Sequence, residues 1–307
     1  MTNKLWVEKY RPQTVGDYVW RDEHQRNQVM QWVNTKSIPH LLLSGSPGTG
    51  KTTLAKVLLN ELGVDDFDIL EINASRTNSV DDVRDKITNF VSTMPFGKFK
   101  IVLLDEADYL SPNAQAALRN LMESFHESAR FILTCNYPHK IIPALHSRCQ
   151  GFHIAKTDAV EFTARVATVL VTEAVEFDLD TLDSYVKATY PDLRKCLQLV
   201  QQHSTSGALR TPTEVGGTVD WRLDTVNLFK QGKLKQARQL LCSQATAEEM
   251  DEVWRWLYDN IEIWGESDDA QDEAILVIRR GLANRSMVAD AEINLSATIV
   301  ELCHIGK

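Results

Sequence analysis

Apolar residues form two kinds of pattern along the chain, and the order of these patterns predicts the fold. Short, nearly unbroken apolar runs, typical of buried strands, occur at 40–43, 67–73, 100–106 and 131–136. Between them, apolar residues recur three and four positions apart, as in amphipathic helices, at 25–33, 53–59, 81–91 and 113–124. Strands that alternate with helices in this way predict an α/β domain with a parallel sheet and flanking helices.

Beyond residue 156 only the helical pattern continues. Helices are predicted at 159–171, 182–190 and 193–202, then at 250–264, 275–282 and 293–302. The range 250–264 has apolar residues at helical spacing throughout and includes Trp254 and Trp264. The ranges 204–207 and 211–217 consist mostly of turn-forming residues and predict a linker. We therefore expect three domains, at 1–155, 156–207 and 208–307, of which the last two are all-helical.

Composition narrows the class of protein. No apolar run approaches the length of a membrane span, and the N-terminus carries charges where a signal peptide needs an apolar core, so we expect a cytosolic protein. The five cysteines form no C-x-x-C pair and are predicted to be reduced, mostly buried thiols. The formal net charge is −9, with most of the acidic excess after residue 204. Any nucleic acid should therefore bind the first two thirds of the chain, through a local basic patch.

A glycine-rich loop between the first strand pattern and the next helix pattern carries the clearest chemistry. Residues 45–52 read GSPGTGKT and fit the phosphate-loop pattern G-x-x-x-x-G-K-[ST] at every fixed position. Glycines let backbone N–H groups turn toward phosphates, and the helix that follows directs its positive end at them. Lys51 is expected to reach the β- and γ-phosphates of a nucleotide, and the Thr52 hydroxyl to ligate Mg²⁺.

Two carboxylates end the strand pattern at 100–106, at the edge where parallel sheets bind ligands. Asp105 is predicted to hold Mg²⁺, and Glu106 to orient or deprotonate the attacking water. The alternative is a solvated acidic turn, which the upstream phosphate loop makes the weaker interpretation.

Several landmarks in order resemble the small ATPase subunit of sliding-clamp loaders, the replication factor C and T4-like phage type within the AAA+ superfamily. The matching stretches are WVEKYRP at 6–12, the phosphate loop, LLDEAD at 103–108, TCN at 134–136, PALHSRC at 143–149 and PDLRK at 191–195. The resemblance covers about residues 5–200. It implies an AAA+ P-loop domain, a small helical lid and a helical collar that binds other subunits.

The resemblance also implies roles for individual residues. Asn136 corresponds to sensor 1, Arg148 to an arginine finger that completes a neighbour's site, and Arg194 to sensor 2. The residues implied to contact ATP are Tyr10, Arg11, Pro12, Val19, Pro47, Gly48, Thr49, Gly50, Lys51, Thr52, Thr53, Asn136 and Arg194. Catalysis is implied for Glu106, Lys51, Asn136 and Arg148. A lone arginine after a loop is more often a surface ion pair, but the Ser-Arg-Cys match favours the finger.

The segments that face DNA in this family depart from its pattern. An ungapped match places Asn78 where the family has arginine, and Arg76 stands two positions before it. Asn120 likewise replaces a second arginine after Arg119. Phosphate contacts are predicted for Arg76, Arg84 and Arg119, with a solvated helix face as the alternative for each.

The function expected from these features is that of a clamp-loader ATPase subunit that uses ATP and Mg²⁺. Its expected partners are primer–template DNA, a sliding clamp and other loader subunits in a five-subunit ring or spiral. Its expected location is the cytosol, including a host's cytosol for a viral protein, or the nucleus in a eukaryote. One alternative is another AAA+ DNA-remodelling ATPase for branch migration or helicase loading. The other is a scaffold subunit that binds ATP without hydrolysing it, which the presence of Lys51, Glu106 and Asn136 disfavours.

Overall fold

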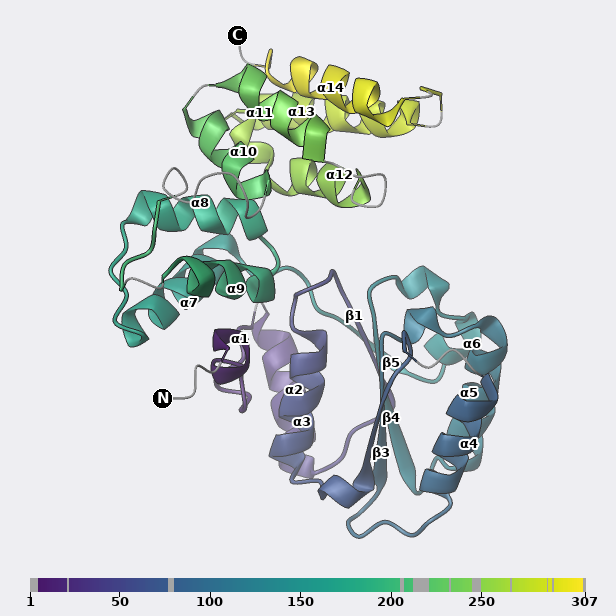
Figure 1. Ribbon diagram of the computed structural model, residues 1–307. Helices are drawn as coiled ribbons and strands as arrows, with labels where there is room; N and C mark the ends of the chain where they lie inside the picture. Colours follow the sequence, from purple (N-terminus) through teal and green to yellow (C-terminus); the bar gives the residue numbers. More distant parts are fainter. Residues whose placement is uncertain are drawn as a thin grey trace. The chain divides into compact units, whose positions relative to one another are not determined.

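The computed structural model describes residues 5–20, 22–76, 80–204, 207–211, 221–231, 233–244, 250–265, 267–285, 287–288 and 290–305. The chain divides into two compact units, Met1–Glu161 and Phe162–Lys307. Figure 1 shows a sheet with helices in the first unit and helices in the second. Among the described residues, no helix is both long and apolar enough to cross a bilayer.

A five-stranded parallel sheet forms the centre of the first unit. Its strands are β1 (Leu41–Ser44), β2 (Ile69–Asn73), β3 (Lys100–Asp105), β4 (Ala129–Cys135) and β5 (Gln150–His153), in the order β2-β3-β4-β1-β5. Because all pairs are parallel, Ser44, Asp105 and Cys135 end their strands at one edge. This sheet confirms the predicted fold class. The sequence patterns gave four of the strands, whereas β5, which has only one buried side chain, was missed.

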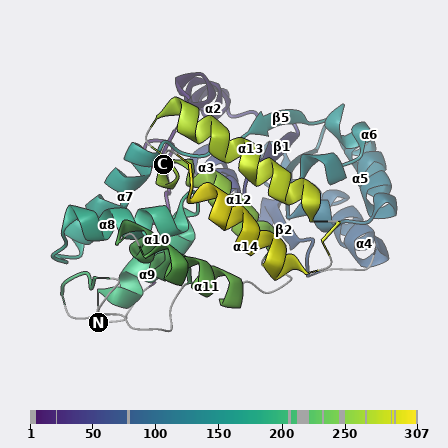
Figure 2. The same ribbon diagram turned by 90° about the horizontal axis from the view of Figure 1, so that it is seen from above.

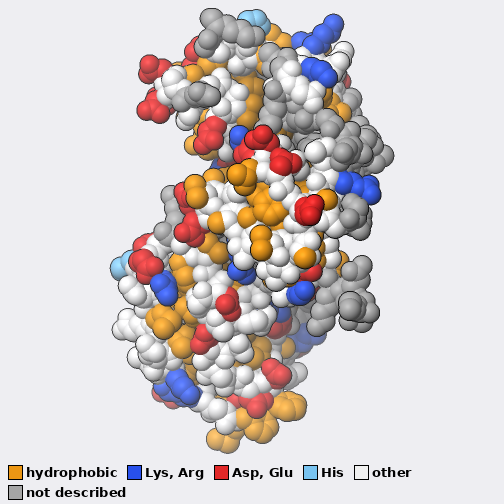
Figure 3. Space-filling view, turned by 90° about the vertical axis from the view of Figure 1, so that its left-hand side faces the viewer, with side chains coloured by type: hydrophobic (Ala, Val, Ile, Leu, Met, Phe, Trp, Pro, Cys, Tyr) orange, Lys and Arg blue, Asp and Glu red, His pale blue; other side chains and the backbone are white. Residues whose placement is uncertain are grey.

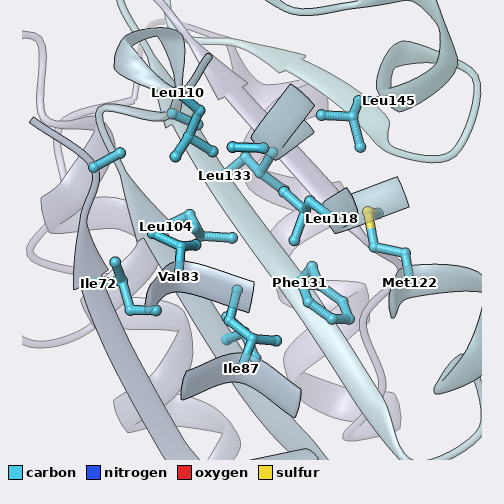
Figure 4. Close-up of a cluster of buried hydrophobic side chains, with 14 of the residues drawn as sticks. Ile72, Val83, Ile87, Leu104, Leu110, Leu118, Met122, Phe131, Leu133 and Leu145 are labelled. Carbon is cyan, nitrogen blue, oxygen red and sulfur yellow. The ribbon is translucent and has the colours of Figure 1, made fainter. Parts of the chain in front are cut away.

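Helices cover both faces of the sheet because the central strands are apolar on both sides. Ile101 and Leu103 of β3 pack with α2 (Glu23–Thr35) and α3 (Lys51–Leu62) on one face. The alternate residues Val102 and Leu104 pack with α4 (Val80–Val91) and α5 (Pro112–Ser124) on the other. Figure 4 shows this second core, in which Leu118 and Met122 of α5 lie near Leu145 of the short helix α6 (Pro143–His146).

The opposite edge of the sheet, where β2 and β3 begin, carries exposed apolar side chains. Phe67, Met94 and Phe96, the apolar patch, are 76%, 89% and 80% exposed. The loop that bears Met94 and Phe96 is fixed by the buried Asp68 carboxylate, which accepts hydrogen bonds from the backbone N–H of Phe96 (3.0 Å) and Gly97 (2.7 Å). Hydrophobic side chains protrude at the lower end of the first unit in Figure 3.

The remaining helices of the first unit are α1 (Trp6–Lys9) and the single 3-10 turns η1 (Asp66–Asp68), η2 (Ala107–Tyr109) and η3 (Pro138–Lys140). All four predicted helices, at 25–33, 53–59, 81–91 and 113–124, are present. Each observed helix end lies within three residues of the predicted end. Helix α3 extends to Leu62 and ends where Gly63 adopts a left-handed conformation (φ 65°).

The described residues of the second unit form helices, as predicted, together with one isolated β-bridge between Glu176 and Ala208. Its first helices are α7 (Ala159–Thr172), which starts in the first unit, α8 (Leu179–Thr189) and α9 (Leu193–His203). They are followed by α10 (Trp221–Lys230), α11 (Leu234–Gln244), α12 (Met250–Asp259), η4 (Ile261–Ile263), α13 (Asp268–Asn284) and α14 (Ala291–Leu302). Helices α10 and α11 were not predicted, and most of the expected linker at 211–217 lies outside the described residues.

The single helix predicted over 250–264 is wrong. Helix α12 ends at Asp259, and Asn260 leaves the helical conformation (ψ 41°) before the turn η4. The buried Asn260 side chain donates to the Trp256 carbonyl at 3.0 Å, beside the Asn260 N–H at 3.1 Å, and local side-chain bonds of this kind compete with continuation of a helix. Trp254 and Trp264 are both buried, but from two elements instead of one face.

Helices α13 and α14 run side by side (Figure 2) and are in close contact at Gly281. A Cβ atom there would lie 2.4 Å from Thr298 Oγ1 and 2.5 Å from Trp254 Cη2. Asn294 donates to the Gly281 carbonyl at 2.8 Å across this contact.

All five cysteines are free thiols, three of them buried, as predicted.

Candidate active site

The phosphate loop joins β1 to α3 and has the backbone that its glycines allow. Gly48 and Gly50 have positive φ values of 74° and 92°, which L side chains rarely adopt. Helix α3 begins at Lys51, so its unpaired N–H groups open toward the loop. Thr49 closes the turn by donating its hydroxyl to the Ser46 carbonyl at 2.8 Å. A positively polarised cradle of backbone N–H groups results, which suits phosphate oxygens.

Lys51 lies inside this loop. Its Nζ donates to the carbonyls of Gly45 (3.0 Å) and Ser46 (2.7 Å), and the residue is only 8% exposed. The Lys51 ammonium group lies where it can donate to phosphate oxygens that enter the cradle. Lys51 therefore has the position predicted for a phosphate-binding lysine.

A network of hydroxyl and carboxylate groups joins three elements at the carboxyl edge of the sheet. Asp105 Oδ1 accepts from Thr52 Oγ1 of α3 (2.7 Å) and from Thr134 Oγ1 of β4 (2.6 Å). The Thr134 hydroxyl also accepts from the backbone N–H of Glu106 (3.0 Å). Mg²⁺ prefers oxygen ligands such as hydroxyl and carboxylate groups, so Thr52 and Asp105 fit a Mg²⁺ site.

Glu106 has a strained backbone, with φ 58° and ψ 43°, in the left-handed region that residues with a side chain rarely occupy. The hydrogen bond to Thr134 holds its N–H in this position. The left-handed conformation turns the chain sharply after β3, so the side chains of Asp105 and Glu106 leave the backbone in different directions. This geometry is compatible with separate roles for the two carboxylates.

Asn136 follows β4, and its loop is fixed by Asp108. The Asp108 Oδ2 atom accepts from the backbone N–H of Asn136 (3.2 Å) and Tyr137 (3.1 Å). Asp108 is 7% exposed, and its Oδ1 has no hydrogen-bond partner. In the sequence, Asp108 stands out only as part of the LLDEAD motif, whereas the structure shows that it fixes the Asn136 loop.

Tyr18 supports the phosphate loop from behind. Its hydroxyl lies 3.4 Å from the Thr49 carbonyl and would lie 3.1 Å from a Cβ at Gly50. Burial raises the pKa of the Tyr18 hydroxyl, so it stays protonated. Nothing in the sequence distinguished Tyr18 from other aromatic core residues.

The chain that leaves the sheet after β5 touches the beginning of the phosphate loop. A Cβ at Gly45 would lie 2.3 Å from the Ile154 carbonyl oxygen. The Ile154 N–H donates to the Ser44 carbonyl (2.7 Å), and Ser44 Oγ lies 3.3 Å from His153 Nδ1. Backbone crowding is thus the reason for glycine at position 45.

Arg148 follows α6 and pairs with an acidic side chain of its own chain. Its Nη2 donates to Glu123 Oε1 of α5, and its Nη1 donates to the Ala144 carbonyl at 3.0 Å. Glu123 Oε1 also lies 3.9 Å from Nε of Arg119, one turn earlier on α5. The sequence predicted Arg119 and Arg148 as separate contacts, but not the carboxylate between them.

The other predicted residues lie around this centre or apart from it. Tyr10 ends α1, Arg11 pairs with Glu8 at 3.0 Å, and Pro12 and Val19 are half-buried. Arg76 and Arg84 are exposed after β2 and on α4, whereas Asn78 lies outside the described residues. Arg194 is exposed in the first turn of α9, in the second unit, so its place relative to the phosphate loop is not defined.

Comparisons with known proteins show the family of this chain. The sequence model of the AAA family, described as "ATPase family associated with various cellular activities", matches residues 41–156. A replication factor C small subunit of Methanococcus maripaludis (strain C7) is 32% identical over 97% of this chain and 91% of its own length. That of Saccharolobus solfataricus is 38% identical over 77% of this chain and 74% of its own.

Solved structures resemble the fold as well. The RuvB Holliday junction branch migration motor of Thermotoga maritima superposes with a TM-score of 0.57 over 78% of this chain and 87% of its own. Its sequence identity of 16% limits this likeness to the fold.

Proposed function

The chain belongs to the replication factor C small-subunit family and is an ATP-hydrolysing subunit of a sliding-clamp loader, and we propose that its residues form one half of a shared catalytic site. The observation that carries this proposal is the network of Thr52, Asp105 and Thr134 beside a complete phosphate loop. The family and the phosphate loop support ATPase activity, while the division of roles among residues is our proposal.

The loop and its lysine bind the triphosphate. Backbone N–H groups around Gly48 and Gly50 receive phosphate oxygens, and Lys51 exchanges its two carbonyl partners for the β- and γ-phosphates. Thr52 and Asp105 would hold Mg²⁺, which when bound offsets charge on the phosphates. Tyr10, Arg11, Pro12 and Val19 contact the adenine side, and Arg194 contacts the phosphates from the second unit.

Glu106 and Asn136 act on the attacking water. Thr134 fixes the Glu106 backbone and Asp108 fixes that of Asn136, so the two side chains project from supported positions. Glu106 orients the water and takes its proton, while Asn136 donates to the water or the γ-phosphate. Lys51, Glu106 and Asn136 occur together in this chain, which favours hydrolysis over a scaffold that only binds ATP.

Arg148 completes the site of a neighbouring subunit, and this requires an assembly, proposed here as a five-subunit ring or spiral. An arginine directed at the γ-phosphate offsets charge that spreads over its oxygens and raises the rate by roughly 10³–10⁵. The exposed position of Arg148 after α6 supports a role in trans. In this assembly, residues 156–207 serve as a lid over the nucleotide and residues 208–307 as a collar between subunits.

Primer–template DNA and the sliding clamp are the proposed partners, wherever the genome is replicated, in the cytosol or in a nucleus. Arg76, Arg84 and Arg119 are the proposed phosphate contacts, because Arg76 and Arg84 are exposed and Arg119 is half-buried, in spite of the acidic net charge of the chain. The apolar patch is the proposed contact with the clamp, since it exposes three large apolar side chains, two of them on a fixed loop, that a protein partner would bury.

The shared site can be tested by mixing two inactive proteins. Lys51→Ala and Arg148→Ala should each be nearly inactive alone. In the mixture, the intact loop of one protein meets the intact finger of the other, and ATPase activity should return and rise steeply with protein concentration. Mixed oligomers that form, as shown by light scattering, without any return of activity would refute a finger in trans.

The role of Glu106 needs a separate test. Glu106→Gln keeps the shape of the side chain and removes its basicity, so ATP should bind while hydrolysis stalls. Loss of ATP binding in this variant would contradict the proposed roles of the two carboxylates.

A further inference from the structure

We propose that Glu123 is a positioning residue for the arginine finger, holding the Arg148 guanidinium in place for the neighbouring subunit's γ-phosphate. This inference rests on the proposed role of Arg148 in trans. It assigns a function to a side chain that no phosphate-loop, Walker or sensor motif includes, and that lies on α5 about one helical turn beyond Arg119.

The guanidinium is held at both of its ends. Nη2 donates to Glu123 Oε1, and Nη1 donates to the Ala144 carbonyl (3.0 Å), with Ser147 Oγ at 3.5 Å. An arginine carries five N–H groups in a rigid plane, so two fixed ends set the direction of the rest. The side chain remains 33% exposed, which leaves part of the guanidinium accessible to another subunit.

The segments that carry Glu123 and Arg148 pack into the same core. Leu118 and Met122 of α5 and Leu145 of α6 belong to the same buried core (Figure 4). The buried Gln115 of α5 also donates to the Lys140 carbonyl (3.0 Å) and accepts from the Ile142 N–H (2.8 Å) in the loop that leads into α6. Glu123 is thus presented from a support that cannot shift independently of the α6 segment.

This pair matters because a free arginine has four flexible bonds before its charged group. An exposed ion pair contributes little to folding stability, so stability does not explain the contact. The contact instead orders the Arg148 side chain. An arginine that is already fixed loses less conformational entropy when the transition state forms. Glu123 is therefore proposed to act through Arg148.

The same carboxylate connects the finger to the proposed DNA contact. Arg148 donates to Oε1 of Glu123, whereas Arg119 donates to Asn120 Oδ1 (2.8 Å) and lies 3.9 Å from the same Oε1. A DNA phosphate that pairs with Arg119 would leave the carboxylate to Arg148 alone. Stimulation of the ATPase by DNA should then depend in part on Glu123.

The test uses Glu123→Gln in the full assembly, with Glu127→Gln as the matched control on an exposed glutamate four residues away. We expect kcat to fall roughly ten- to a hundredfold in Glu123→Gln, with KM for ATP nearly unchanged. DNA stimulation should shrink as well. Glu127→Gln should match the wild type.

Two further measurements separate positioning from a structural role. Adding Glu123→Gln to Arg148→Ala should cause no further loss of activity, because both changes remove the same function. Mixing Glu123→Gln with Lys51→Ala should raise the rate above that of the same amount of Glu123→Gln alone, since Lys51→Ala chains supply well-positioned fingers. A misfolded protein or a defect in its own ATP site would not be rescued.

Each contrary result has a defined meaning. Wild-type kcat in Glu123→Gln, with Arg148→Ala inactive, would overturn the role of Glu123 and leave the finger in place. A higher DNA-free rate would overturn it too, by showing that Glu123 withdraws the finger. If Arg148→Ala itself were fully active in the assembly, the proposed finger would fail first.

Discussion

Replacing Thr134 with valine should disable hydrolysis while leaving the nucleotide bound. Valine has nearly the same shape as threonine but has no hydroxyl, and Thr134 is only 1% exposed, so packing is preserved. The change removes the bond to Asp105 Oδ1 (2.6 Å) and the acceptor of the Glu106 N–H (3.0 Å). Both carboxylates of the site lose a support at once.

The size of the effect follows from these two bonds. A hydrogen bond to a charged group contributes about 1.5–3 kcal/mol, and a buried N–H left without a partner costs about 1–3 kcal/mol. The Glu106 backbone stores strain of order 1–3 kcal/mol in its left-handed conformation, so it should relax once released. A displaced catalytic group of this kind lowers kcat by roughly 10²-fold.

Steady-state ATPase with primed DNA and clamp measures kcat, and fluorescence of a labelled ATP analogue measures binding. We expect kcat to fall about a hundredfold in Thr134→Val and the affinity for ATP to change by less than about tenfold. Thr134→Ser is the control, because it keeps the hydroxyl and should keep most of the activity. Wild-type kcat in a folded Thr134→Val protein would refute the support role of this hydroxyl.

Four other predictions concern separate parts of the molecule. Arg84→Glu should weaken primer–template binding and reduce the slope of log affinity against log salt by about one; an unchanged slope would exclude a phosphate contact. Met94→Ser with Phe96→Ser should lower clamp-stimulated ATPase but not basal ATPase, and equal clamp stimulation would contradict the proposed docking role of the apolar patch. Burial, with Arg130 nearby, lowers the pKa of His40 from 6.5 to about 4. As pH falls from about 6.5 toward 4, the unfolded chain binds this proton before the folded protein does, so the free energy of unfolding should decrease. The urea midpoint of His40→Asn should depend less on pH over this window, and an identical pH dependence would contradict this. Gly281→Ala should destabilise the second unit by about 1–3 kcal/mol in thermal unfolding, because its Cβ would overlap Thr298 and Trp254; an unchanged melting temperature would contradict the close packing.

The phosphate loop and the acidic strand end could be predicted because each has its own local sequence pattern. Lys51 and Thr52 follow a strand and a glycine turn, Asp105 ends a second apolar strand, and the parallel sheet brings Thr52 and Asp105 together. The central strands were equally clear, since a strand buried on both faces is apolar throughout. Strand β5 was missed because only Phe152 of its four residues is buried.

The supporting residues of the site could not be predicted, because no sequence motif marks them. Tyr18 meets Thr49, Thr134 meets Asp105, and Glu123 meets Arg148, in each case through packing that no local pattern encodes. The break after Asp259 was missed for a different reason. Apolar spacing continues through Trp264, so periodicity alone predicts one helix, whereas the Asn260 side chain bonds to the preceding turn and ends it.

The contact between Gly45 and Ile154 places the exit of the nucleotide-binding unit directly against its phosphate loop. Their backbones are so close that even a methyl group at Gly45 would overlap the Ile154 carbonyl, and the Ile154 N–H is bonded to Ser44. Residues 155–161 then lead to the second unit without returning to the sheet. A loop that changes shape when phosphate arrives or leaves must therefore displace the first residues of this connection. The covalent connection that begins at Ile154 thus links the phosphate loop to the helical unit.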